Sequence, residues 1–508
     1  MAKTFYLTTP IYYASGPPHL GHAYTTIAAD VIARFKKLQG YDVFFLTGTD
    51  EHGQKVEKAA KEQGKTPKQF VDEIVEQYKQ LFKQLNINYD HFIRTTDPSH
   101  EKAVQAIFQR FYDAGWIYKG TYEGWYCIYC ETFLTQLQLV DSKCPDCGRP
   151  VQREKQESYF FKLSAFKEKL QKLFEENKTF VEPQSRWHEN YNFFKDELRD
   201  LSVSRKGLKW GIPVPFDKTH TVYVWLDALF NYLTALGYDG KSSKLNGKAK
   251  KYWPADVHLV GKEIAKFHAV YWPAFLWAAG IELPKKIYAH GWWTVEGEKM
   301  SKSKGNFIDP HTVIAEYGSD ALRYFVMREN SFGEDGDYSA KSFQARYNGE
   351  LADELGNLLN RTLVMLHRFS QGAVPAAKKS KLKEETLKRV EKYETEMNGF
   401  QFNRGLETTW EILRSANQLI NQTEPWKLAK EEKTEQVNAV LRDLAEALRI
   451  SAIMLYPFMP VKSAEIYNAL KLKGIEKEKL ASAKKWNLIK AGTITADGIM
   501  LFPKKEKK

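Results

Sequence analysis

The chain has 508 residues, of which 43% are hydrophobic, and a formal net charge of +12. This length suggests about three domains, and no uninterrupted apolar run approaches the ~20 residues of a membrane-spanning helix. The first ten residues, MAKTFYLTTP, lack the apolar segment of a secretory signal. We therefore expect a cytosolic protein that does not bind membranes, with a basic surface that suits a polyanionic partner.

The first 55 or so residues predict a strand, a helix and a second strand. Residues 5–13 are apolar and β-prone, residues 22–39 have helical periodicity, and residues 41–53 read as a buried strand that ends in a polar loop. This βαβ order predicts a parallel sheet whose site lies at the carboxyl ends of its strands. No GxGxxG follows the first strand, so a dinucleotide-binding fold is not indicated.

Two histidines stand at the start of the predicted helix. His19 and His22 are three positions apart in PHLGHAY, so both rings face one side of the first helical turn. A helix N-terminus has unpaired N–H groups and partial positive charge, and it attracts phosphate. The stretch is therefore consistent with a nucleotide-phosphate site, and equally with two histidines that only cap a helix.

All four cysteines lie within one short stretch, in two CxxC pairs: Cys127, Cys130, Cys144 and Cys147. Four thiolates in this pattern fit a tetrahedral zinc ion. Two disulfides are the alternative, which a cytosolic location disfavours, as does Gly148, a residue that suits a tight knuckle turn. Because four protein ligands leave no open position, we expect one structural zinc ion.

The rest of the chain divides into three further stretches. Residues 117–221 hold the cysteines and read as an insertion into the sheet domain. A sheet-like pattern then resumes over 221–236 and 257–281, on either side of an exposed basic loop at 240–251. After about residue 350 the pattern is helical almost to the end, and the terminal PKKEKK is expected to be frayed.

A second cationic segment follows the last sheet-like stretch. KMSKS is followed by KGN and places Lys299, Lys302 and Lys304 within six residues. Such a loop can neutralise the charge that develops on a triphosphate during displacement at the α-phosphorus. Taken alone, lysines and serines of this kind usually belong to a solvated loop.

Together, HLGH and KMSKS resemble the two signatures of class I aminoacyl-tRNA synthetases. Over nearly its whole length the chain resembles the methionyl-tRNA synthetase family, in TTPIYYASGPPHLGH, LTGTDEHG, the double CxxC, YVWLDA, GKEIAKFHAVYWPA, HGWWTVEGEKMSKSKGN and EPW. The resemblance implies an α/β protein: a class I Rossmann-like parallel-sheet catalytic domain (1–116 and 222–292) with a zinc-knuckle insertion (117–221). A KMSKS-loop and stem-contact region (293–353) and an all-α anticodon-binding bundle (354–508) would follow.

The same resemblance implies an activity. The family activates L-methionine with ATP and Mg²⁺ to methionyl-adenylate and pyrophosphate, and then transfers the methionyl group to tRNA(Met), which carries a CAU anticodon. The implied catalytic residues are His19, His22, Lys299 and Lys302. The implied ATP-binding residues are Gly21, His290, Gly291 and Lys302.

Two further sets of residues are carried over from the family. The implied methionine site consists of Ile11, Tyr13, Asp50, Trp225, Ala228, Leu229, Tyr232, Ile264 and His268, with Asp50 paired to the substrate ammonium. The implied anticodon site consists of Asn357, Arg361 and Trp426, with the indole stacked on an unpaired base. The structural alternatives are a turn-forming Asp50 and a buried Trp426.

Three rival functions are open at this point. Another class I synthetase, for leucine, isoleucine, valine or cysteine, is disfavoured because the interval from His22 to Lys299 leaves little room for an editing insertion. A closed Cys₄ site also offers no position for a cysteine substrate. A small nucleotidyltransferase has no use for the helical third, and a non-catalytic tRNA-binding relative has no use for intact signatures. The chain ends soon after the bundle, so recruitment of a separate tRNA-binding protein stays open.

Overall fold

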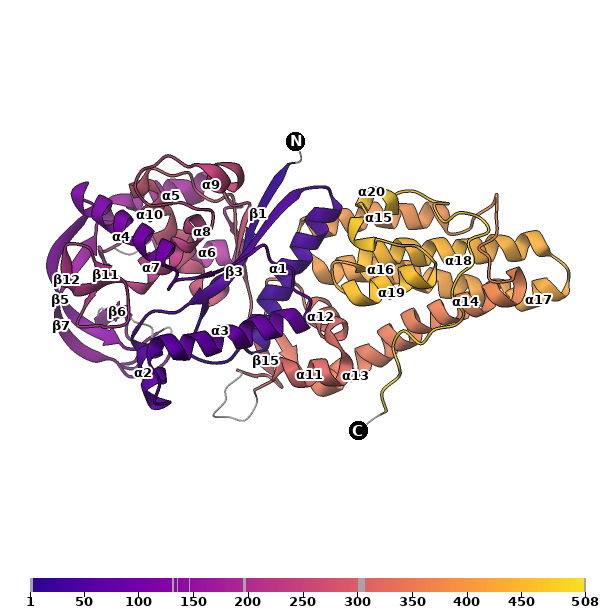
Figure 1. Cartoon of the computed structure of the whole chain (residues 1–508), viewed down its shortest axis with the longest axis horizontal. Helices are drawn as coiled ribbons and strands as arrows, with labels where there is room; N and C mark the ends of the chain where they lie inside the picture. The colour runs from indigo at the N-terminus through magenta and orange to yellow at the C-terminus, as the bar shows by residue number, and fades with distance from the viewer. Residues whose placement is uncertain are drawn as a thin grey trace.

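The computed structural model describes residues 3–129, 132–134, 136–145, 147–194, 198–299 and 307–506. Figure 1 shows a head built around a β-sheet and, to its right, an elongated bundle of helices. Helix α1 (Leu20–Leu38) lies at the boundary between the two. Within the described residues, no helix is both long and apolar enough to pass through a lipid bilayer.

The centre of the head is a parallel sheet, as predicted. Its strands run in the order β2 (Tyr12–Tyr13), β3 (Asp42–Asp50), β1 (Thr4–Thr8), β13 (Val257–Gly261), β14 (Ile287–His290) and β8 (Val181–Glu182), and β4 (His91–Arg94) also pairs with β3. The strand expected over 5–13 is broken between β1 and β2. Pro10 lies in the gap, and proline has no N–H to give to a sheet ladder.

Side chains of β1 alternate between the two faces of this sheet. Phe5 and Leu7 join a hydrophobic cluster that contains α1 and continues without a break into the helical bundle. Tyr6 points to a second cluster, which fills the side of the head that carries the insertion. The head also contains α2 (Gln54–Glu62), α3 (Pro67–Gln84), α4 (Pro98–Asp113), α9 (Gly247–Tyr252) and α10 (Trp272–Ala279), besides the helices described below.

The stretch 117–221 forms two small antiparallel sheets at the far end of the head. The first contains β5 (Ile117–Cys127), β6 (Thr132–Leu134), β7 (Gln152–Phe161) and β9 (Leu201–Ser202). The second contains β10 (Ser204–Lys206), β11 (Pro213–Val214) and β12 (Asp217–Val222). Between β7 and β9 the chain forms α5 (Lys167–Glu176), then β8, which pairs with β14 at the edge of the parallel sheet, and then α6 (Gln184–Asn192).

Two stretches predicted as sheet-like are mainly helical. After β12, residues 221–236 continue as α7 (Val224–Leu229) and α8 (Asn231–Thr234). In residues 257–281 only β13 is extended, and helical turns then lead into α10. The prediction was wrong because buried helices, like buried strands, are apolar on all sides: Phe230, Leu233 and Trp272 are fully buried.

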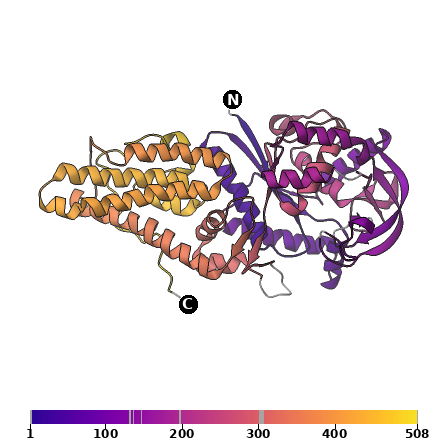
Figure 2. The ribbon, with the colours of Figure 1, turned by 180° about the vertical axis from the view of Figure 1, so that it is seen from behind.

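The region after β14 links the head to the bundle. Strands β15 (Trp293–Val295), β16 (Glu298–Lys299) and β17 (Gly336–Tyr338) form a small sheet. Helices α11 (Pro310–Tyr317) and α12 (Ser319–Arg328) lie between β16 and β17 in the chain, and α13 (Ala340–Arg346) follows β17. The bundle consists of α14 (Asn357–Ser370), α15 (Lys383–Asn398), α16 (Phe402–Thr423), α17 (Pro425–Lys430), α18 (Thr434–Leu455), α19 (Pro460–Ala469) and α20 (Leu480–Ala483), seen from behind in Figure 2.

The C-terminal segment differs from the frayed tail that we expected. The backbone N–H of Lys505 donates to Asn348 Oδ1 over 2.9 Å, and Asn348 Nδ2 donates to the carbonyl of Lys505 over 2.8 Å. Lys504 also pairs with Asp353 at 2.8 Å. A side-chain amide that mimics a strand partner therefore holds the chain as far as Glu506, which accepts from Gln344.

Candidate active site

The predicted site residues lie where the parallel strands of the sheet end. Strand β3 ends at Asp50, β13 at Gly261 and β14 at His290, and Gly261 is the register partner of His290. The short strand β2 places Tyr13 opposite Asp50. The residues expected to bind the nucleotide and the amino acid therefore gather at one edge of the sheet, as in other open α/β folds.

His19 and His22 cap the N-terminus of α1 with their imidazoles. His19 Nδ1 accepts the N–H of Gly21 over 3.0 Å, and His22 Nδ1 accepts the N–H of His19 over 3.1 Å. Their ring centroids are 3.8 Å apart. Because both Nδ1 atoms accept hydrogen bonds, the ring proton of each lies on Nε2. The capping role and the phosphate role are thus compatible: capping orients two Nε2–H donors at a helix N-terminus.

Burial and the neighbouring His19 lower the pKa of His22 well below its usual value, so the ring is neutral. Two tyrosines support it. Tyr78 of α3 has its hydroxyl 3.3 Å from His22 Nδ1, and the Tyr12 ring lies edge-on, 5.0 Å from the imidazole. The two tyrosine rings stack on each other at 5.5 Å. His22 therefore stands in a prebuilt aromatic setting that limits its movement.

Two glycines in the predicted nucleotide site are required by close approach. A Cβ on Gly21 would lie 2.9 Å from His19 Cε1, so a larger residue would displace the His19 ring. A Cβ on Gly291 would lie 2.4 Å from the backbone of Glu334. The second contact packs the loop before β17 against the end of β14.

His290 is engaged by the protein on both ring nitrogens. Its Nδ1 donates to the carbonyl of Gly291 over 2.8 Å, and its Nε2 accepts from the hydroxyl of Thr25 on α1 over 2.9 Å. Burial lowers the pKa of His290, so it is neutral as well. In this arrangement His290 ties the end of β14 to α1, next to the helix terminus that carries His22.

Described residues flank the interval 300–306 on both sides. The β15–β16 hairpin begins just after His290 and carries Lys299 opposite Thr294. Lys302 lies outside the described residues. The described chain resumes at Phe307, whose ring centroid is 6.1 Å from that of His19. Phe307, the first described residue after the interval 300–306, therefore lies beside His19.

Most of the predicted methionine-site residues surround two short helices. Trp225, Ala228 and Leu229 belong to α7 and Tyr232 to α8. The indole of Trp225 stacks on Phe267 with centroids 3.8 Å apart. Ile11 and Ile264 are half-buried against the same hydrophobic cluster, while Leu229 is buried within it.

Tyr232 and His268 form a buried polar pair in this wall. His268 Nδ1 donates to the carbonyl of Ile264 over 3.0 Å, so its Nε2 accepts the Tyr232 hydroxyl over 2.7 Å. Burial lowers the pKa of His268 to about 4. The wall is therefore uncharged, with aromatic and polarizable surfaces that suit an apolar side chain.

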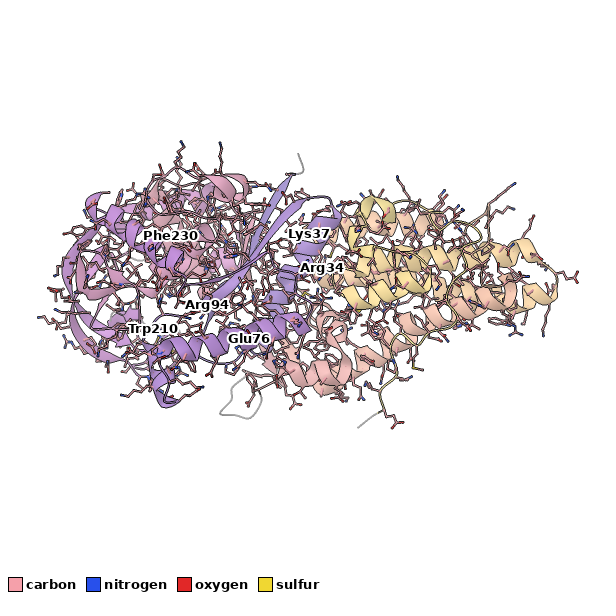
Figure 3. All side chains as sticks on the ribbon, in the orientation of Figure 1. Arg34, Lys37, Glu76, Arg94, Trp210 and Phe230 are labelled. Atoms are coloured by element: carbon pink, nitrogen blue, oxygen red, sulfur yellow. The ribbon has the colours of Figure 1, made fainter. Side chains whose placement is uncertain are left out.

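The residues that follow Asp50 are held by contacts that the sequence analysis missed. Glu51 is fully buried and accepts two hydrogen bonds from Arg94, at 2.6 and 2.9 Å, while Trp210 donates to its carbonyl. Arg94 and Trp210 are labelled in the head in Figure 3. His52 Nδ1 lies 2.7 Å from Asp227 Oδ2. These bonds fix the end of β3, and with it Asp50, which is itself only 8% exposed.

Asp227 joins three elements of the head through one carboxylate. Its second oxygen accepts from His100 Nε2 of α4 over 2.8 Å, and Asp227 itself stands on α7 between Trp225 and Ala228. Burial disfavours a charged His52, but Asp227 outweighs that effect and raises the pKa of His52 to about 10. His52 lies in DEHG and Asp227 in WLDA, two of the segments that carry the family resemblance. An acid and a base in such segments were the available signal that the two residues form a pair.

Three of the four predicted metal-binding cysteines lie together. The Sγ atoms of Cys127, Cys144 and Cys147 are all within 4.8 Å of one another, and Cys127 Sγ is 3.5 Å from Cys147 Sγ. That separation is too long for a disulfide and close to the ~3.7 Å between thiolates that share one zinc ion. Gly148 has the positive φ, +67°, expected of a knuckle turn. Cys130 lies outside the described residues.

The predicted anticodon residues lie on the surface of the bundle. Asn357 is exposed at the start of α14, and Arg361 donates to Asn421 Oδ1, near the end of α16, over 3.3 Å. Trp426 at the start of α17 is 36% exposed, whereas Trp410 in the same bundle is fully buried. The alternative of a buried Trp426 is therefore excluded.

Known proteins similar to this chain agree with the geometry. A family model described as tRNA synthetases class I (M) matches residues 5–156 and 148–363, and one for the anticodon binding domain of methionyl tRNA ligase matches residues 370–507. The methionine–tRNA ligase of Caldanaerobacter subterraneus subsp. tengcongensis is 52% identical over 99% of this chain and 79% of its own length. That of Clostridium tetani is 48% identical over 99% of this chain and 78% of its own length.

Solved structures give the same result. Mycobacterium tuberculosis methionyl-tRNA synthetase in complex with methionyl-adenylate has a TM-score of 0.93 and 39% identity, over 99% of this chain and all of that chain. The free form of the same enzyme has a TM-score of 0.87 and 36% identity, over all of this chain and 99% of that chain. The chain therefore belongs to the methionine–tRNA ligases, a family of the class I aminoacyl-tRNA synthetases.

Proposed function

We propose that this chain activates L-methionine with ATP to methionyl-adenylate and pyrophosphate, and then transfers the methionyl group to tRNA(Met). The observation that carries the proposal is the pair of Nε2–H donors of His19 and His22 at the start of α1, with Phe307 beside them. Imidazole N–H donors at a helix N-terminus can bind phosphate oxygens, because the helix terminus also favours negative charge.

In this reaction the methionine carboxylate attacks the α-phosphorus and pyrophosphate leaves, so the protein supplies no nucleophile. Its contribution is to position the reactants and to stabilise charge. His19 and His22 donate to the triphosphate, with Gly21, His290 and Gly291 shaping the nucleotide site. Lys299 and Lys302 balance the charge of the departing pyrophosphate, together with Mg²⁺ on the triphosphate.

We assign the methionine site to the end of β3 and the walls of α7 and α8. Asp50 would accept the substrate ammonium, since the contacts of Glu51 and His52 hold this carboxylate in place. Tyr13, Trp225, Ala228, Leu229, Tyr232, Ile11, Ile264 and His268 would enclose the thioether. An uncharged aromatic wall favours a polarizable sulfur over a charged or strongly polar side chain.

One structural zinc ion is proposed for the cysteine cluster. Cys127, Cys144 and Cys147 would bind it together with Cys130, and the donor set of thiolates favours zinc over hard cations. A site closed by four protein ligands stabilises the small sheet of residues 117–221 and takes no part in the reaction.

The bundle, residues 354–508, is proposed to read the CAU anticodon. Asn357 and Arg361 offer side-chain hydrogen bonds, and the exposed indole of Trp426 offers a stacking surface for an unpaired base. Trp426→Ala is expected to lower the rate of tRNA charging at subsaturating tRNA by ~10-fold or more, since stacking is worth about 1–3 kcal/mol per base. Pyrophosphate exchange should be unchanged; equal loss of both activities would contradict an anticodon role.

The activity itself is tested by amino-acid-dependent exchange of pyrophosphate into ATP. Methionine, leucine, isoleucine, valine and cysteine are compared, and charging is then measured with tRNAs that differ only in the anticodon. Methionine should support the fastest exchange, and the CAU tRNA the fastest charging. Faster exchange with another amino acid would assign the chain to a different class I substrate, and no exchange with any of them would remove the proposed chemistry.

A further inference from the structure

Helix α1 carries the two active-site histidines at one end and contacts the helical bundle at the other. Past its middle, Lys36 Nζ donates to Asn398 Oδ1 over 2.6 Å, and Gln39, which follows the helix, donates to Glu394 Oε1 over 3.0 Å. Both partners belong to α15. A helix of 19 residues spans about 28 Å, so α1 is a stiff connection between the bundle and His22.

A buried charged cluster fixes the middle of this helix. Asp30 accepts from Arg34 Nε and from Arg323 Nη2, both at 2.7 Å, and all three side chains are almost fully buried. We call Asp30, Arg34 and Arg323 the Asp30 cluster. Burial disfavours ionisation of Asp30, but the two guanidinium groups outweigh it and lower the pKa of this carboxyl.

Arg323 of α12 connects the cluster to the bundle and to α3. It donates to the carbonyls of Pro457 and Phe458, at 2.7 and 2.8 Å, where the chain turns from α18 to α19. It also donates to the carbonyl of Leu85, which ends α3, over 3.1 Å. Carbonyls at two helix C-terminal ends thus help to balance the second guanidinium charge.

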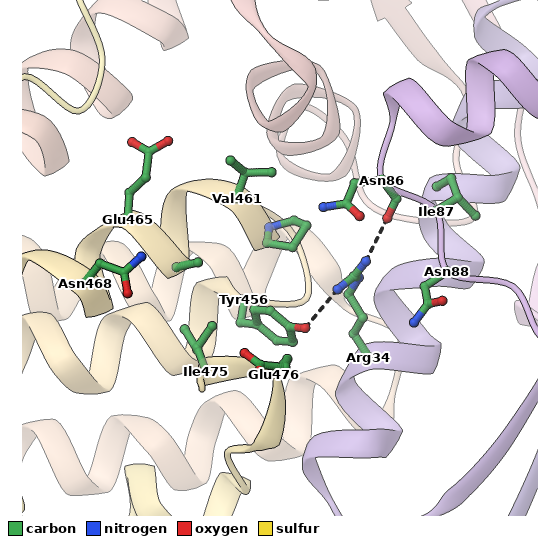
Figure 4. A pocket seen from close by; sticks show the side chains of 12 residues that line it. Arg34, Asn86, Ile87, Asn88, Tyr456, Val461, Glu465, Asn468, Ile475 and Glu476 are labelled. Atoms are coloured by element: carbon green, nitrogen blue, oxygen red, sulfur yellow. Dashed lines mark hydrogen bonds between the residues drawn. The ribbon is translucent and has the colours of Figure 1, made fainter. Parts of the chain in front are cut away.

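Helix α3 also connects the Asp30 cluster to the active site. It carries Tyr78, whose hydroxyl lies beside His22, and it ends at the Asp30 cluster. Arg34 adds two bonds there, to the carbonyl of Asn86 over 2.7 Å and to the hydroxyl of Tyr456 over 3.0 Å (Figure 4). Both helices that place His22 are therefore anchored at one cluster, which also holds a corner of the bundle.

We propose that Asp30, Arg34 and Arg323 are positioning residues for adenylate formation: through α1 and α3 they make the placement of His19 and His22 depend on the docking of the helical bundle. This inference rests on the proposed role of the two histidines at the triphosphate. None of the three residues touches the reacting atoms. Their effect reaches the site along helices whose far ends are held by the bundle.

The contacts between α1 and the bundle are made by single side chains, so each can be removed by one substitution. A cavity of about 650 Å³, lined in part by Arg34, Tyr456, Val461 and Glu476, lies beside them (Figure 4). Tyr456 borders this cavity and Asn398 is exposed, so both side chains can be shortened without emptying a packed core. Tyr456→Phe keeps the ring against Arg34 but removes the hydroxyl, and Asn398→Ala removes the acceptor of Lys36.

The test uses the full-length double variant Tyr456→Phe/Asn398→Ala. Active sites are counted from the burst of adenylate, and methionine-dependent pyrophosphate exchange is then expressed per active site. We expect kcat to fall ~10-fold, because displacement of a catalytic group by a fraction of an ångström is costly. The KM for methionine should be unchanged, since the pocket side chains of α7 and α8 do not belong to α1.

A matched control is Lys392→Ala, which removes an ion pair between α15 and α16, 3.2 Å long, that does not involve α1. Its kcat per active site should equal that of the wild type. Asp30→Asn is the stronger variant, used only if it folds. A normal kcat per active site in the double variant would overturn the inference, whatever its thermal stability. If the wild-type chain itself lacked exchange, the proposed function would fail instead.

Discussion

Two histidine sites in the head have opposite charge states, although burial acts to lower the pKa of both rings. Burial, together with the neighbouring His19, lowers the pKa of His22, so this ring is neutral. His52 is 4% exposed, yet its pKa is raised to about 10. The difference is the neighbour: His22 faces another imidazole, whereas His52 faces the carboxylate of Asp227 at 2.7 Å.

Each charge state suits the place of the residue. A neutral ring with its proton on Nε2 can donate to a phosphate and release it when the product leaves. A charged ring bonded to a buried carboxylate is a fixed contact between the loop after β3, α4 and α7. Burial favours the neutral form of both rings, and only His52 has a carboxylate close enough to outweigh it, so His22 can act on a ligand while His52 holds the structure.

The largest expected effect on stability comes from removing the Asp227 carboxylate, which His52 has as a neighbour and His22 does not. Asp227→Ala leaves His52 and His100 without their acceptor in a buried place, and it should lower the free energy of unfolding by about 3–5 kcal/mol. Urea denaturation measures it. Glu101→Ala is the control, since Glu101 lies on the exposed side of the same imidazole, 3.6 Å from Nε2, and exposed pairs contribute about 0–1 kcal/mol. Equal losses would mean that burial of the pair is unimportant.

Removing the neutral ring should affect catalysis more than stability. His22→Ala removes one donor to the developing charge, and pyrophosphate exchange should fall ~10²–10³-fold, as for loss of a single preorganised donor. The KM for methionine should change little, because the pocket lies on other elements. A variant that exchanged at the wild-type rate but unfolded at much lower urea would instead make His22 a structural residue like His52.

The smallest effect is a difference in the pH dependence of stability. Because the pKa of folded His52 lies above the ordinary 6.5, its contribution is complete below pH 6.5 and is lost as the pH rises towards 10. The stability advantage of the wild type over His52→Gln should therefore shrink by about 2 kcal/mol between pH 8.5 and pH 10. Urea denaturation across this range measures it. An advantage that stays constant with pH would show that His52 is not charged in the folded chain.

Several parts of the fold and site were readable from local patterns. The parallel βαβ opening and the helical last third each depend on short-range periodicity, and the structure confirms them. The site at the strand ends follows from the same pattern and stays a prediction. The helices after β12 and β13 were not readable, because a fully buried helix has no polar face to reveal its period. The hydrogen bonds between Lys505 and Asn348 were missed for another reason. The local sequence of a polar tail does not reveal a partner that lies more than a hundred residues away in the chain.

By itself the sequence determined which side chains are candidates for the sites: the histidine pair, the lysines of KMSKS, the cysteine pairs and the tryptophan of EPW. These are local features, set by residue types a few positions apart. Only the tertiary structure decided their states. The proton of His22 is on Nε2, His52 is charged, and α1 is held by Arg323 and Tyr456, because electric fields and hydrogen-bond partners come from residues far apart in the chain.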